Sequence, residues 1–173
     1  MFAAGIDTSS ATIIWAMAEM MRNQRVLRKA QIEIRETSRR ETTNFKEFST
    51  STNNYHYLKL HARVPLLVPR DCSSSARSMI MIYLPKKADP ESFIPERFEN
   101  SSINFTGNDY EFIPFGAGRR MCPGITFGTN SVESTLVNLL HHFEWQLPNG
   151  MEPQDIINME ESDGITTTLK APL

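Results

Sequence analysis

A loop of unusual composition holds the residues best suited to chemistry. Residues 112–124 read Phe-Ile-Pro-Phe-Gly-Ala-Gly-Arg-Arg-Met-Cys-Pro-Gly, and a helical pattern follows from Ile125. A thiolate that binds a metal or haem iron needs a lowered pKa, a backbone that approaches closely, and donors that stabilise the charge on sulfur. The loop offers its glycines, the helix N-terminus after Cys122, and Arg120 as a partner for a carboxylate. We therefore predict an anion-stabilised thiolate site at Cys122.

A structural cysteine, buried in a tight loop, is the alternative interpretation of Cys122. Free cysteines are among the most buried residues and are often unreactive. The density of glycine and arginine favours the ligand role, because Gly116, Gly118 and Gly124 permit left-handed turns and the close approach of a flat cofactor.

The same residues resemble the haem-binding signature of the cytochrome P450 family, Phe-x-x-Gly-x-Arg-x-Cys-x-Gly, at every fixed position. The resemblance implies that Cys122 is the proximal thiolate ligand of haem b, where it pushes electron density toward O–O cleavage. It also implies that Arg120 pairs with a haem propionate and that Phe115 packs near the sulfur. Gly118 and Gly124, the matching glycines, complete the implied cofactor-binding loop.

A second segment, near the start of the chain, resembles the oxygen-activation motif of the family's central helix. It reads Ala4-Gly-Ile-Asp-Thr-Ser9, which implies that Asp7 and Thr8 support proton delivery to iron-bound dioxygen. A mid-helix Gly-x-Asp-Thr also brings a carboxylate and a hydroxyl to a widened groove. Without the resemblance, a solvated Asp or Thr on a helix surface is the alternative.

Two more segments occur in the family's order. Pro95-Glu-Arg-Phe98 resembles the segment that supplies an arginine, here Arg97, to the family's structural triad of charges. Leu60-His61 and the following Pro65–Arg70 resemble the stretch after the family's Glu-x-x-Arg helix, which implies that Arg70 reaches the other haem propionate. The amino-acid sequences of these segments are most similar to those of plant microsomal enzymes of the A-type group.

The chain departs from the family in its middle. The Glu-x-x-Arg helix is expected directly before Leu60, but Tyr57-Leu-Lys59 stands there, so about eight residues, two helical turns, are predicted to be missing. Glu36-Thr-Ser-Arg39 has the right spacing but follows the preceding helix, too far upstream. The segment 72–88 is shorter than the family's strand and meander and differs from them in sequence. Since removing one side of a buried charge pair costs about 3–5 kcal/mol, we predict a weakened fold and impaired activity.

The elements that position these residues predict a mainly α fold with small β elements. Helical patterns cover residues 2–22, mostly buried, about 25–36, and 125–143. The apolar face of the last helix is predicted to consist of Phe127, Val132, Leu136, Leu139, Leu140 and Phe143. A buried strand is predicted at 79–84 and a terminal β element at 165–169.

The resemblance implies that these elements form a single partial cytochrome P450 domain over residues 1–173. Its predicted parts are the oxygen-activation helix with the following helix (1–37), a connector, strand and meander (38–111), the haem-thiolate loop with the last long helix (112–143), and a C-terminal β region (144–173). The resemblance covers the C-terminal part of the family's fold, so we expect the membrane anchor and most pocket helices to be absent.

Composition excludes several classes of protein. With 173 residues, 40% hydrophobic and 22% charged, the chain can bury a core, and its net charge of −2 does not suggest nucleic-acid binding. Two cysteines do not make a disulfide scaffold, and the four histidines lack zinc-site spacing. His141-His142 is predicted at the solvated end of the last helix, where cations are favoured. No Gly-x-Ser-x-Gly elbow indicates serine hydrolysis.

The resemblance implies a haem-thiolate monooxygenase of plant secondary metabolism, which oxidises a small lipophilic metabolite with O2 and NADPH. Its electrons come through NADPH-cytochrome P450 reductase, for which Arg119, Arg120, Lys86 and Lys87 are a candidate positive face; ordinary surface charge is the alternative for the lysines. The family resides at the endoplasmic reticulum membrane, whereas a chain without an anchor is expected to be cytosolic or peripheral. The alternative function is a non-catalytic haem-binding or interaction polypeptide, or a non-functional truncated product.

Overall fold

The computed structural model describes residues 2–40, 93–98, 105–109, 113–147, 161–162 and 168–169. Their elements are the α-helices α1 (Phe2–Arg22), α2 (Gln24–Arg40) and α5 (Ile125–His142), the 3-10 helices η2 (Pro95–Phe98) and η3 (Gly118–Arg120), and the strands β1 (Glu161–Ser162) and β2 (Thr168–Leu169). The strands pair antiparallel. This part is mainly helical with a small β element, as predicted. The strand expected at 79–84 and Arg70 lie outside the described residues.

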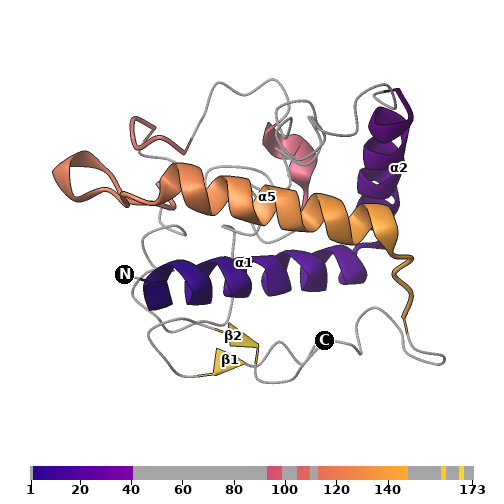
Figure 1. The fold of residues 1–173 in the computed structure, drawn as a ribbon, viewed down its shortest axis with the longest axis horizontal. Coiled ribbons are helices and arrows are strands. Elements are labelled where there is room, and N and C mark those ends of the chain that lie inside the picture. The colour runs from indigo at the N-terminus through magenta and orange to yellow at the C-terminus, as the bar shows by residue number, and fades with distance from the viewer. Residues whose placement is uncertain are drawn as a thin grey trace.

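The helices α1 and α5 lie side by side and run in the same direction, while α2 rises steeply from the far end of α1 (Figure 1). One apolar core joins the three helices. Its buried members are Ala16, Met17, Met20, Val26, Leu27, Ala30, Ile34, Val132, Leu136, Val137 and Leu140. Because α1 and α5 are parallel, both begin at the same end of the molecule, where the loop that holds Cys122 leads into α5.

Burial of α1 is confined to its later turns. Residues 5–8 are exposed, whereas Trp15 to Ala18 and Met20 are buried, so the predicted mostly buried helix is correct only for its second half. The helix ends at Asn23, whose side-chain amide donates to the Glu19 carbonyl at 2.9 Å. The Asn23 carbonyl then accepts from the Val26 amide at 2.8 Å and starts α2. One asparagine therefore both ends α1 and begins α2.

The helix α2 continues to Arg40, beyond the predicted end near residue 36. Its apolar face, Val26, Leu27, Ala30 and Ile34, is buried as predicted. The apolar pattern stops at Ile34, which is why sequence periodicity ends the helix too early. Residues 37–40 contain no glycine or proline, so nothing in them interrupts the backbone hydrogen bonds, and the predicted connector does not begin at residue 38.

The helix α5 buries Val132, Leu136 and Leu140 and packs Leu139 partly against the core, as predicted. Two predicted members of that face are wrong: Phe127 is 74% exposed and Phe143 is 56% exposed. Phe127 stands in the first turn, ahead of the buried stretch. Phe143 follows the last helical residue, where the backbone turns extended.

The end of α5 is tied to α2. The Gln31 side chain, which is buried, donates to the Phe143 carbonyl at 3.2 Å, and Arg35 pairs with Glu144. His142 is exposed, but His141 is half-buried. Burial lowers the pKa of His141, and the charges of His142 and Arg35 lower it further. The predicted solvent-exposed position therefore holds for His142, whereas His141 is half-buried.

The shared core predicts unequal effects for two isoleucines of α2. Ile34→Ala is expected to lower the free energy of unfolding by about 2–5 kcal/mol, because it leaves a cavity among fully buried side chains. Ile32→Ala, at a side chain that is 57% exposed, is expected to change it by about 0.5 kcal/mol or less. Urea unfolding followed by circular dichroism measures both. Equal losses would contradict a core built on this face of α2.

Candidate functional site

The loop that holds Cys122 is closed by its own backbone. The Cys122 amide donates to the Phe115 carbonyl at 2.9 Å, which joins the two arms of the loop. A turn begins the loop, with the Gly116 amide donating to Ile113 at 3.0 Å, and the Met121 amide donates to Gly118 at 3.2 Å. These bonds hold the cysteine at a fixed position before α5.

Two glycines of this loop adopt the left-handed backbone conformation. The φ angles are 75° at Gly116 and 71° at Gly118, as the sequence predicted. Nothing lies within 4 Å of a Cβ added at either residue, so both face open space. Gly124 differs from the prediction: its φ is −95°, because it occupies the N-cap position of α5.

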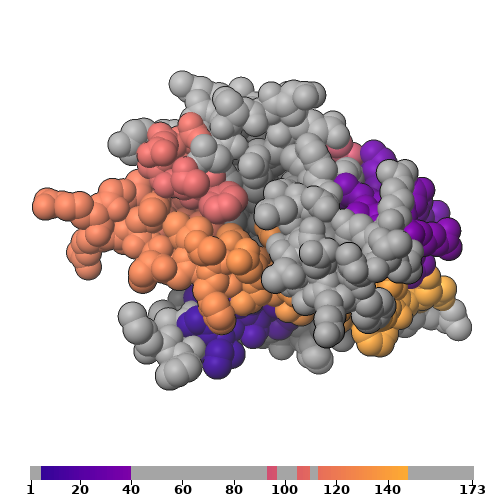
Figure 2. All heavy atoms as spheres, turned by 45° about the horizontal axis from the view of Figure 1, so that its top comes forward, coloured from indigo at the N-terminus to yellow at the C-terminus, as the bar shows by residue number. Residues whose placement is uncertain are grey.

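Cys122 is an exposed, free thiol, which excludes the buried structural cysteine that the sequence left open. The loop that carries it projects from the left side of the molecule in Figure 2. A Cβ added at Gly124 would lie 3.9 Å from the Cys122 sulfur, so Gly124 borders the thiol without crowding it. The first turn of α5 follows directly and holds no acidic residue. Its unpaired amides and the helix dipole favour an anion at this position.

The other predicted loop residues lie close to Cys122 in the chain. Arg120 lies in η3, two residues before Cys122, with its side chain exposed toward solvent. Phe115 is half-buried, and its ring meets the Phe105 ring edge to face, with centroids 5.8 Å apart. The loop thus offers a thiol, a guanidinium and an aromatic wall within eight residues of chain.

Asp7 and Thr8 lie in the exposed first half of α1. The Thr8 carbonyl accepts a hydrogen bond from the Thr12 hydroxyl at 2.8 Å. The parallel packing places this half of α1 at the end of the molecule where α5 begins (Figure 1). The structure therefore brings the acid–threonine pair and the cysteine loop to the same end. Arg70 lies outside the described residues.

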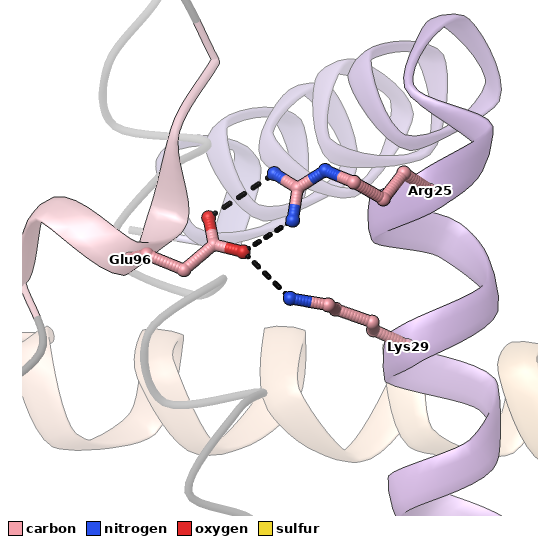
Figure 3. Close-up of polar contacts among 3 residues, drawn as sticks. All are labelled: Arg25, Lys29 and Glu96. Atoms are coloured by element: carbon pink, nitrogen blue, oxygen red, sulfur yellow. Dashed lines mark hydrogen bonds and ion pairs between the residues drawn. The ribbon is translucent and has the colours of Figure 1, made fainter.

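An ion cluster fixes η2 onto α2. The Glu96 carboxylate accepts from Arg25 through both oxygens and from Lys29 at 3.1 Å (Figure 3). These hydrogen bonds, above all that from Arg25, hold the pKa of Glu96 well below its usual range. Pro95 beside it is fully buried. Sequence reasoning singled out Arg97 and missed Glu96, although the spacing of Arg25 and Lys29 by four residues on α2 signals one charged face.

The donor set fits a haem iron better than a bare metal ion. Within the described ranges, no three His, Cys, Asp or Glu side chains converge on a position for an ion. The exposed Cys122 thiol would suit an iron whose other ligands come from a macrocycle. The open space at Gly116 and Gly118 accommodates a flat group, and Arg120 suits its carboxylates.

None of the described helices is both long enough and apolar enough to cross a bilayer.

Comparison with known proteins decides the family. The cytochrome P450 family profile matches residues 1–73 and 88–171, which is most of the chain and includes the cysteine loop. The chain belongs to the cytochrome P450 family. Costunolide synthase of Cichorium intybus is 46% identical over 197 aligned positions, which cover 100% of this chain and 39% of that protein. Cytochrome P450 71D7 of Solanum chacoense is 45% identical, with coverage of 100% and 39%.

A third relative, premnaspirodiene oxygenase of Hyoscyamus muticus, is 43% identical, with coverage of 100% and 38%. The chain thus spans about two-fifths of the length of these curated relatives. All three come from plants, which confirms the predicted similarity to plant P450 enzymes.

The middle of the chain differs from these P450 relatives. Residues 74–87 fall outside the family match. They lie within residues 72–88, the segment predicted to differ from the family in length and sequence. The alignment with the Cichorium enzyme has 197 positions for 173 residues, so about 24 positions have no residue of this chain. The predicted deletion before Leu60 lies outside the described residues.

The ion cluster predicts a pH-dependent contribution to stability. Glu96→Gln is expected to lower the free energy of unfolding by about 0.5–1 kcal/mol at pH 7 and low salt, because it removes the charge that Arg25 and Lys29 share. Since folding lowers the pKa of Glu96, its stabilisation is complete above the carboxyl's ordinary pKa of about 4.3, declines as the pH falls below that value, and is lost at the lower pKa of the folded state.

Glu36→Gln, which removes an exposed carboxylate from α2, the helix that carries Arg25 and Lys29, is the control and is expected to change stability less. Urea unfolding at pH 7 and at pH 3, with and without salt, measures both variants. A Glu96→Gln loss that persists unchanged at pH 3 would contradict the assignment to the ion cluster.

Proposed function

We propose that Cys122 is the axial thiolate ligand of haem b and that this chain is the haem-binding part of a cytochrome P450 monooxygenase. One observation carries the proposal: the exposed Cys122 thiol, in a loop closed onto Phe115, directly precedes α5 within a family-matched signature. When bound, haem supplies the activation of O2 from which one oxygen atom enters a substrate.

The loop residues bind and orient the cofactor in this proposal. The first turn of α5 stabilises the negative charge on the Cys122 sulfur. Gly118 and Gly124 would leave room for the cofactor, and Phe115 would pack near the sulfur. Arg120, together with Arg70, neutralises the propionates.

The first half of α1 handles protons in this proposal. The Asp7 carboxylate is open to solvent and would serve as the acid of the pair. The Thr8 hydroxyl beside it would hold a proton for transfer. A positioned acid and hydroxyl of this kind contribute through general acid–base catalysis.

The proposed substrate is a small lipophilic metabolite, and the relatives named above as a synthase and an oxygenase support this class of reaction. The proposed electron donor is NADPH-cytochrome P450 reductase. Arg119 and Arg120 are exposed on η3 and give this side of the loop a positive charge suited to an acidic partner. Association with the endoplasmic reticulum membrane, which the similarity to microsomal enzymes implies, belongs to the same proposal.

A second candidate function is a non-catalytic haem-binding polypeptide. Two observations favour it: residues 74–87 lie outside the family match, and about 24 positions of the alignment with the Cichorium enzyme have no residue of this chain. A P450 that has lost internal segments can keep the cysteine loop without the other residues that catalysis needs. An NADPH-dependent oxidation assay with added reductase separates the two. Turnover that Cys122→Ala abolishes supports the monooxygenase; stoichiometric haem binding without turnover supports the second candidate.

The thiolate assignment predicts a spectroscopic difference between the two cysteines of the chain. Haem titration of the wild type, followed by reduction and addition of carbon monoxide, is expected to give a thiolate-type Soret band. Cys122→Ala is expected to lose that band, because alanine removes the sulfur ligand, while Cys72→Ala retains it. The absorption spectra of the three proteins measure this. A band of the same type in Cys122→Ala would overturn the assignment.

A further inference from the structure

Residues 105–109 pack against both arms of the cysteine loop. The contacts centre on Gly107, where an added Cβ would lie 3.0 Å from the Met121 sulfur, 3.2 Å from the Gly116 carbonyl oxygen and 3.4 Å from the Ala117 Cα. Gly116 and Ala117 belong to the first arm, and Met121 directly precedes Cys122 in the second. Figure 2 shows the 105–109 segment lying over the base of the projecting loop.

The same segment makes a second contact through Phe105. Its ring meets the edge of the Phe115 ring, at an interplanar angle of 63°. The Phe115 carbonyl accepts the Cys122 amide that closes the loop. Phe105 therefore contacts the residue whose carbonyl accepts the hydrogen bond from Cys122. Aromatic pairs with this edge-to-face geometry favour one relative orientation of the two rings.

Gly107 is required for close approach as well as for backbone conformation. Its φ is 88°, a value that residues with a side chain rarely adopt. The loop glycines Gly116 and Gly118 share a positive φ but have open space around them. Only at Gly107, among the described glycines, would an added Cβ come within 3.4 Å of other atoms, and two of those are backbone atoms that cannot move aside cheaply.

The residues around the thiol have little packing of their own, since Cys122, Pro123 and Gly124 are all exposed. Because Met121 directly precedes Cys122, a shift of the backbone at Met121 is expected to move the sulfur.

We propose that the 105–109 segment sets the position of Cys122, with Gly107 and Phe105 as positioning residues. For its effect on haem, this inference rests on the proposed function. For its effect on the thiol itself, it stands on the geometry of the loop alone, so the two can fail separately.

The test compares Gly107→Ala with Gly128→Ala in the full 173-residue chain. Gly128 lies in α5 with nothing within 4 Å of an added Cβ, so it controls for a glycine-to-alanine change near the loop. The first measurement is the rate of Cys122 alkylation by iodoacetamide in the haem-free chain across pH, resolved by peptide mass spectrometry. The second is haem affinity and the Soret band of the reduced carbon monoxide complex.

Gly107→Ala is expected to change the alkylation rate or its pH profile by about threefold or more and to weaken haem binding by about tenfold, the factor that backbone strain of this kind produces. Gly128→Ala is expected to leave both unchanged. A Gly107→Ala chain that keeps its helical circular dichroism and matches the wild type in both measurements would overturn the proposal.

Two further experimental outcomes have a defined interpretation. If the wild type forms no thiolate-type complex, the proposed function fails, and the alkylation profile alone decides the positioning role. If Gly107→Ala does not fold, Phe105→Leu decides, because it keeps an apolar side chain while removing the ring contact with Phe115. Phe105→Leu is expected to shift the same measurements in the same direction by a smaller factor, and an unchanged profile would overturn the proposal.

Discussion

The parallel packing of α1 on α5 is the constraint on which the candidate site depends. Met17 and Met20 of α1 share one buried cluster with residues of α5 such as Leu136, and Ala16 lets the backbones approach. Because the two helices run in the same direction, their beginnings lie at one end of the molecule. Asp7 and Thr8 on one side and Cys122 on the other, more than a hundred residues apart in the chain, are brought to that end by the packing of α1 on α5.

The buried core and the candidate site occupy different turns of α1 and α5. In α1 and in α5 alike, the early turns are exposed and the later turns are buried. The core gains stability where the helices meet α2, while the polar and reactive residues remain accessible at the opposite end. The exposure of Phe127, in the first turn of α5, follows the same division and places a large apolar side chain beside the cysteine loop.

Sequence patterns predicted the helices and the glycine turns of the cysteine loop because those depend on local signals. The bounds of α1 and the start of α5 agree with the apolar spacing, and the left-handed turns at Gly116 and Gly118 agree with glycine's freedom. The helix α2 continues past its apolar pattern because residues 37–40 contain no glycine or proline. The exposure of Phe143 depends on what it packs against, which periodicity does not contain. The close contact of Gly107 with Met121 was not predicted for the same reason, because the two residues lie in separate turns of the chain.

The Glu96 cluster shows how charge at long range completes what apolar packing begins. Phe93 packs against the core and Pro95 is fully buried, so hydrophobic contact already seats this segment near α2. Apolar contact has no direction, however, and leaves a 3-10 turn free to rotate. Two cations spaced by one turn of α2 impose a direction, because a single carboxylate reaches both in only one orientation (Figure 3). The orientation of η2 is thereby set about ten residues before the segment that supports the cysteine loop.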